Sequence, residues 1–335
     1  MAGFSTNSWA IANKYLIIDF CRKKAIKLGF ERKSDSQDWT DDENKKCLEF
    51  LQHVPAREFG MTLLGDKTVI NETRLALTPV IDGELFPKSI AQLRAEAVPK
   101  PSIVGVTMHE GLLFLALGRK SANNKFLRFC ENKVELLLQS HPSTESSDVL
   151  TLAAYRELYG INDDLIKNKK LTQRACVDIM SDLINGVGLH RYCVQSAETG
   201  TCYRYMFDQF NPSITRAFNL LLPFTGATHG CEIPFIFNVN IFTTPFFKTK
   251  ADRRVSNLMT QTFANFCKYG NPNGNDPSKP QFNFNWKPVS KSHPDQHLVF
   301  TDNVEFKEEP EKNYHAKLMP VLDDLYETLS ASSQQ

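Results

Sequence analysis

A short run of β-branched and small residues, Ser102 to Met108, most constrains the fold of this chain. Pro99 and Pro101 precede it, and a carboxylate followed by glycine, Glu110-Gly111, ends it. This composition predicts a strand that begins after the prolines. Reactive side chains of open α/β sheets gather beyond the carboxyl ends of the strands, so Glu110 is a candidate functional residue. A solvated glutamate on a strand-to-helix loop is the alternative.

A second stretch, residues 226–237, places His229 between small residues that leave its ring uncovered. An acidic residue, a proline and an aromatic-aliphatic run follow at once. The pattern predicts an exposed imidazole on a turn that a buried segment anchors. Imidazole is the side chain best suited to carry protons near neutral pH, so His229 is a candidate general base. A purely structural histidine is the alternative.

The order of the two candidates, carboxylate and then histidine, is that of the α/β-hydrolases, in which the nucleophile precedes both. The chain resembles the type-B carboxylesterase and cholinesterase family. Six landmarks carry the resemblance: Pro79-Val80-Ile81-Asp82-Gly83 with Leu85-Phe86-Pro87; Glu110-Gly111; Tyr203-Arg204-Tyr205-Met206-Phe207-Asp208; Gly226-Ala227-Thr228-His229-Gly230; Asn265-Phe266 with Gly270-Asn271-Pro272-Asn273; and Trp286-Lys287-Pro288. The resemblance implies an α/β fold, namely the C-terminal part of an α/β-hydrolase with a mostly parallel central sheet flanked by helices.

The resemblance also implies a function, carboxylic ester hydrolysis of the Ser-Glu-His type through an acyl-enzyme. His229 would take the serine proton and return it to the leaving alcohol, and Glu110 would orient the imidazole and stabilise its charged form. The implied substrate is a small-molecule carboxylic ester, and no cofactor is implied. The alternative is a non-catalytic, cholinesterase-like adhesion protein that binds partners. The presence of both Glu110 and His229 favours the enzyme.

The chain departs from the family at the nucleophile. It contains no G-x-S-x-G, and the nearest segment, Gly3-Phe4-Ser5-Thr6-Asn7, lacks the second glycine. The glycine-rich oxyanion loop is absent as well. We therefore expect residues 1–335 to be one carboxylesterase domain, truncated at its N-terminus and inactive alone. Residues 123–200 are expected to form the helical insertion that covers the active-site mouth in the family.

Composition and charge limit the other kinds of function that this chain could have. The formal net charge of +1 argues against a global field that would attract nucleic acid. No apolar run approaches the roughly 18 residues of a membrane span, so no transmembrane helix is expected. The eight cysteines form no C-x-x-C and no histidine pair has zinc spacing, so no metal site is expected. The oligomeric state and the compartment stay open.

The family resemblance also implies a loop disulfide in its secreted members. Cys47-Leu48 matches the second half of that loop, but Phe30 stands where the first cysteine belongs. The absence of the first cysteine slightly favours a reducing, cytoplasmic compartment.

Local signals predict several further elements. Thr40 caps a helix that runs to about His53, and Gly270 ends a long helix that starts at Asp252. Thr172 is predicted to cap a helix as well. Alternating patterns predict strands over 78–86 and 282–286, and an amphipathic pattern predicts a last helix over 314–329.

Overall fold

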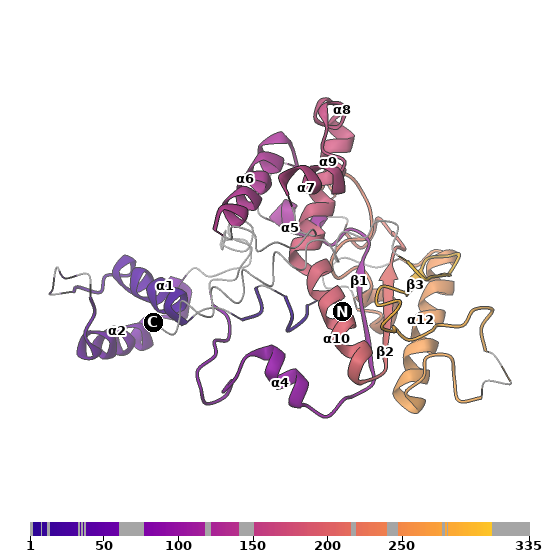
Figure 1. Ribbon diagram of the computed structural model, residues 1–335, viewed down its shortest axis with the longest axis horizontal. Coiled ribbons are helices and arrows are strands. Elements are labelled where there is room, and N and C mark those ends of the chain that lie inside the picture. The colour runs from indigo at the N-terminus through magenta and orange to yellow at the C-terminus, as the bar shows by residue number, and fades with distance from the viewer. Residues whose placement is uncertain are drawn as a thin grey trace.

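The computed structural model describes residues 3–7, 9–11, 14–32, 34, 36, 38–59, 77–117, 122–140, 151–215, 219–239, 247–276, 279 and 281–309. Within these ranges a four-stranded sheet in the order β1-β2-β3-β4 is flanked by helices (Figure 1). The sheet is mostly parallel, and the predicted α/β class is confirmed. The strands are β1 (Ser102–Thr107), β2 (Cys202–Phe207), β3 (His297–Phe300) and β4 (Glu305–Lys307).

Parallel pairing places the carboxyl ends of the first three strands at one edge of the sheet. β1 pairs with β2 so that Thr107 lies beside Phe207, and β2 pairs with β3 so that Phe207 lies beside Phe300. Only β4 runs antiparallel, with His297 opposite Lys307. The segments that follow β1 and β2 therefore leave the sheet on the same side, and these segments carry Glu110 and His229.

Alternating side chains of β1 and β2 enter two different cores. Val104 and Val106 pack with Leu189 and Cys193 of helix α10 (Val187–Thr199) on one face. Tyr203, Tyr205 and Phe207 pack on the other face against helix α12 (Lys250–Tyr269). Gly105 is the neighbour of Tyr205, and a Cβ at this position would come within 2.4 Å of the tyrosine ring. The strands are thus covered on both faces, as expected for parallel strands.

A third core holds the helices that precede α10. Helix α5 packs on α9, and the core includes Leu112 and Leu115 from α5 and Val177 and Met180 from α9. The bounds of the helices in this region are α5 Gly111–Leu117, α6 Asn124–Ser140, α7 Leu152–Leu158, α8 Asp163–Lys167 and α9 Lys169–Ser181, and a π-helical turn η2, Asp182–Gly186, joins α9 to α10. This core fixes where α5 begins, directly after Glu110.

The N-terminal helices α1 (Lys14–Lys27) and α2 (Asp41–His53) form a hairpin that lies apart from the sheet in Figure 1. The predicted Thr40 cap is confirmed, because its hydroxyl accepts the Glu43 N–H while the Glu43 side chain accepts the Thr40 N–H. Phe30 stacks on Trp39 with ring centroids 6.0 Å apart. Cys47 is a buried free thiol.

Besides the long helix α12, three short helices remain: η1 (Ala56–Phe59), α4 (Ile90–Glu96) and α11 (Ile233–Phe237). The predicted end of α12 at Gly270 is confirmed, since Gly270 has φ +68° and donates its N–H to Phe266 O. The helix starts two residues earlier than predicted, because Thr249 is its N-cap and Asp252 completes the capping box.

Two predicted strands are wrong. In residues 78–86 only Val80 forms a β-bridge, and the segment is not one of the four strands of the sheet. Residues 282–286 also stay outside it, because the Asn273 side chain replaces a partner strand: its Oδ1 accepts the Trp286 N–H at 2.8 Å and its Nδ2 donates to Trp286 O at 2.9 Å. The strands β3 and β4, which the sequence pattern did not indicate, complete the sheet instead.

The predicted cap at Thr172 is also wrong. Asn168 caps α9, because its side chain accepts the N–H groups of Lys170 and Leu171, and Thr172 lies buried one turn further on. The predicted helix over 314–329 lies outside the described residues.

Candidate active site

Glu110 occupies the end of the turn between β1 and α5. The strand ends at Thr107, and the Thr107 N–H donates back to Glu110 Oε1 at 2.7 Å. This contact folds the carboxylate inward beneath the strand end, and Glu110 is only 2% exposed. The alternative of a solvated loop glutamate is therefore wrong.

Gly111 follows because α9 passes close to the chain at this point. A Cβ at Gly111 would lie 2.6 Å from Val177 O and 2.8 Å from Met180 Cβ. The Gly111 N–H also donates to Ser181 Oγ at 2.9 Å. The Glu-Gly pair in the sequence thus combines an inward carboxylate with a residue small enough to touch the neighbouring helix backbone.

His229 lies on a turn that is fastened to the segment around Glu110. The His109 N–H donates to Ala227 O at 2.9 Å, and the Leu113 N–H donates to Thr228 Oγ1 at 2.9 Å. Gly230, with φ +80°, lets the chain reverse directly after the histidine. Two hydrogen bonds therefore bring the histidine turn and the acid turn together.

The two predicted residues meet. His229 Nδ1 lies 2.6 Å from Glu110 Oε2. The His229 side chain is 32% exposed, whereas that of Glu110 is 2% exposed. The Phe114 ring packs against the imidazole with centroids 5.0 Å apart. Since Nδ1 is committed to the carboxylate, Nε2 is the ring nitrogen that can exchange a proton with a third group.

Electrostatics favour charge on both members of this pair. Burial lowers the pKa of His229, but the hydrogen bond to Glu110 and the negative charge of Glu110 outweigh it, and the net pKa is raised. Burial raises the pKa of Glu110, but the His229 contact and the Thr107 N–H outweigh it, and the net pKa is lowered. The buried carboxylate stays ionised at neutral pH and can stabilise an imidazolium.

Two further residues of the site escaped the sequence prediction. Asn185 is 1% exposed and donates its Nδ2–H to Glu110 Oε2 at 3.0 Å. Glu232, also 1% exposed, has its pKa raised by burial and then by the charge of Glu110. Asn185 gave no signal because it lies on the π-helical turn, where the helical periodicity used to assign faces does not apply.

Two polar side chains at the junction of α9 and η2 have structural partners. Ser181 Oγ donates to Val177 O at 2.7 Å and accepts the Gly111 N–H. Asp182 Oδ2 accepts the Tyr159 hydroxyl at 2.9 Å. Neither contact reaches His229.

His109, the neighbour of Glu110, is a second histidine close to the pair. Burial, and then the Arg174 charge, lower its pKa to about 4. The Nε2 of the neutral His109 ring lies 2.9 Å from Arg174 Nη1 and accepts a hydrogen bond from it. It packs against Phe224 and Gly226 and supports the histidine turn.

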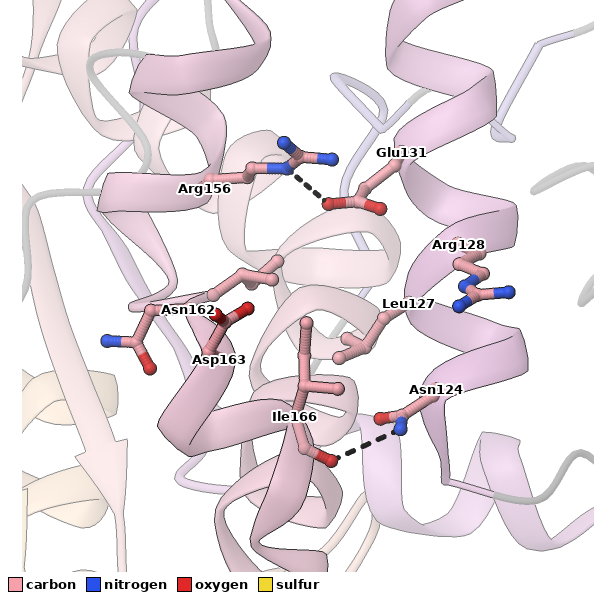
Figure 2. A pocket seen from close by; sticks show the side chains of 9 residues that line it. Asn124, Leu127, Arg128, Glu131, Arg156, Asn162, Asp163 and Ile166 are labelled. Atoms are coloured by element: carbon pink, nitrogen blue, oxygen red, sulfur yellow. Dashed lines mark hydrogen bonds and ion pairs between the residues drawn. The ribbon is translucent and has the colours of Figure 1, made fainter.

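A cavity of about 270 Å³ lies elsewhere, among α6, α7 and α8 (Figure 2). Its walls mix charged and apolar side chains, and Arg156 Nε meets Glu131 Oε1 at 2.7 Å across it. The lining residues are Asn124, Leu127, Arg128, Glu131, Arg156, Ile161, Asn162, Asp163 and Ile166. It shares no residue with the Glu110–His229 pair.

In the part of the chain that the structure describes, no group of three or more His, Cys, Asp or Glu side chains is placed to hold a metal ion. Within the same ranges, no helix combines the length and the apolar character that crossing a membrane requires.

Comparison with known proteins agrees with the resemblance that the motifs indicated. Residues 1–317 match the model of the carboxylesterase family. Esterase cest-33 of Caenorhabditis elegans is 28% identical over 232 residues, which cover 67% of this chain and 39% of that protein. Liver carboxylesterase 1 of Oryctolagus cuniculus is 30% identical over 225 residues, covering 64% and 37%. Acetylcholinesterase of Electrophorus electricus is 24% identical over 352 residues, covering 95% and 54%. The chain thus spans between a third and about half the length of these relatives.

Proposed function

Because this chain belongs to the carboxylesterase family, whose fold is the α/β-hydrolase fold, we propose that it supplies the acid and the base of a serine carboxylic ester hydrolase. Glu110 is the acid and His229 is the base. The substrate class is a small-molecule carboxylic ester, and the reaction passes through an acyl-enzyme. The chemistry needs no cofactor.

The contact between His229 Nδ1 and Glu110 Oε2 carries the proposal. With Nδ1–H donated to the carboxylate, Nε2 accepts the proton of a serine hydroxyl while the serine oxygen attacks the ester carbonyl. The tetrahedral intermediate then expels the alcohol, which takes the proton from Nε2. Water repeats the sequence on the acyl-enzyme and releases the acid. Glu110 stabilises the imidazolium in both halves without taking the proton.

The nucleophile must come from a segment that these 335 residues do not contain, since none of them lies in a G-x-S-x-G. Triad members act as a unit, so the chain alone is expected to be nearly inactive. The missing oxyanion donors should lower the activity further, because each donor contributes roughly 3 kcal/mol of transition-state stabilisation. In this proposal residues 1–335 belong to one domain, and residues 123–200 cover the active-site mouth and set the substrate range.

The test uses the polypeptide encoded by the complete transcript. A serine in a G-x-S-x-G upstream of the present sequence, labelled by a fluorophosphonate probe, is the expected result. Hydrolysis of short-chain p-nitrophenyl esters should accompany the labelling, and His229→Ala should abolish both while the protein stays folded. A transcript that encodes no such serine, with no labelling and no turnover, would favour the adhesion-protein alternative and overturn the proposal.

A further inference from the structure

The turn η2 interrupts an otherwise continuous helix beside the acid. Residues 182–186 adopt one π-helical turn, and the flanking residues Ser181 and Val187 keep right-handed helical angles. A π turn inserts one residue into the helical repeat and rotates the side chains around it. Such turns are frequent at functional sites. Here the rotation points Asn185 at Glu110.

The N-terminal segment holds this turn in place. Trp9 Nε1 donates to Ile184 O at 2.6 Å, and Thr6 Oγ1 donates to Gly188 O at 2.6 Å. Gly188 is required for the approach, because a Cβ there would lie 1.6 Å from Asn7 Oδ1. Side-chain donors thus satisfy one carbonyl of the irregular turn and one at the start of α10, and they fix the position of the turn.

Asn185 links the N-terminal segment to Glu110 through hydrogen bonds of its side-chain amide. Its Oδ1 accepts Asn7 Nδ2 at 3.3 Å, and its Nδ2 donates to Glu110 Oε2 at 3.0 Å. An ionised carboxylate only accepts hydrogen bonds, so the amide nitrogen must face it. The same oxygen, Oε2, accepts the His229 ring. One carboxylate oxygen therefore serves two donors, and Thr107 holds the other oxygen.

We propose that Asn185 is a positioning residue for the acid and base: it holds Glu110 Oε2 where His229 meets it and takes a share of that oxygen's charge. The inference rests on the proposed function for its catalytic meaning. The sharing weakens the hold of Glu110 on the imidazolium, so the base releases its proton at a lower pH than it would beside Glu110 alone. Among the described residues, the other titratable side chains near Glu110 are Glu232, Tyr205 and Cys231.

The experiment measures the titration of His229 by NMR in the 335-residue chain, labelled at histidine and assigned through His229→Gln. In Asn185→Leu the carboxylate loses one donor and binds the imidazolium more strongly. The His229 midpoint should rise by about 0.5 to 1 pH unit, the equivalent of one ordinary hydrogen bond. Asn265→Leu, which removes another buried amide donor on α12, should leave the midpoint unchanged.

An unchanged midpoint in Asn185→Leu would reduce Asn185 to a packing residue and overturn the inference. A lowered midpoint would mean that Glu110 moves away once Asn185 is gone, which supports the positioning role and overturns the charge sharing. If the leucine variant does not fold, Asn185→Ser takes its place in the same comparison, because a serine side chain is too short to reach Glu110. The titration requires no turnover. Failure of fluorophosphonate labelling in the complete protein would therefore contradict the proposed function without affecting the result of this titration.

Discussion

Glu110 and His229 are 119 residues apart in the chain, and their side chains meet at 2.6 Å. The contact joins a nearly fully buried carboxylate to a ring that is one-third exposed. A charge held out of solvent acts more strongly on its neighbour than an exposed one, because the local dielectric is low. The exposed edge of the same ring can reach a reactant. This asymmetry is what an acid–base pair requires.

Replacement of Glu110 by glutamine should remove the charge while keeping the shape. Burial, the largest effect on His229, is then opposed only by the more weakly acting charge of Glu232, so the pKa of His229 should fall below the ordinary value of about 6.5. In the complete protein, kcat should fall by a factor on the order of 10⁴, the loss seen when a triad acid is neutralised. NMR titration of His229 and ester hydrolysis measure the two effects. Glu131→Gln, which alters the distant pair with Arg156, is the matched control and should change neither.

The pH profile of the complete enzyme should follow the raised pKa of His229. The base acts in its neutral form, so kcat/KM should rise as His229 loses its proton. Because the net effect of Glu110 is to raise this pKa, the midpoint of the rise should lie above about 6.5. A midpoint below that value, measured at fixed ionic strength, would contradict the assignment of His229 as the base beside an ionised Glu110.

Gly111→Ala should destabilise the fold at the junction of α5 and α9. The new Cβ would lie 2.6 Å from the Val177 carbonyl, and a backbone oxygen cannot move aside cheaply. We expect a loss of about 1–3 kcal/mol in the free energy of unfolding, measured by urea denaturation. Gly200→Ala is the control, because its Cβ would come no closer than 3.3 Å to Pro99 Cβ. Equal losses in the two variants would count against a packing origin.

Arg204→Met should be among the most destabilising substitutions in the sheet. Arg204 is 1% exposed, and its guanidinium forms an ion pair with Asp295, which also meets His190 Nδ1 at 2.8 Å. Removing the arginine leaves a buried carboxylate without its main counter-charge, at a cost of about 3–5 kcal/mol. Arg254→Met breaks the exposed pair with Asp302 and should leave the free energy of unfolding nearly unchanged. Thermal and urea unfolding of the two variants compare them directly.

His297 should make the fold sensitive to mild acid. Burial, and then the Arg204 charge, lower its pKa to about 4, whereas the unfolded chain binds this proton near 6.5. Stability is therefore complete above about 6.5 and decreases as the pH falls toward 4, by about 3 kcal/mol from this residue. His297→Asn keeps a donor near Asp295 O but cannot titrate, so it should flatten the slope.

Much of the candidate site could be predicted because its signals are local. A β-branched strand that ends in Glu110-Gly111 and a histidine between small residues can each be recognised without knowing the fold. The family and its α/β fold were indicated by the resemblance that the six landmarks carry in the order of the family. Asn185 could not be found in this way, because it belongs to no local pattern and matters only through its contact with Glu110, from another part of the chain. Glu232 belongs to the stretch around His229, but the sequence does not show that it is buried within reach of the Glu110 charge.

The sequence by itself determined the family, the strand β1, and the two side chains suited to carry charge and protons, since strand propensity, capping and residue chemistry act over a few neighbours. Tertiary structure alone decided which groups meet. The π-helical turn directs Asn185 toward Glu110, and the Asn273 amide takes the place of a strand beside Trp286. The contact between Glu110 and His229 outweighs burial and sets the direction of both pKa shifts. These outcomes depend on distances between segments remote in the chain, and such distances are set only when the sheet and its helices pack together.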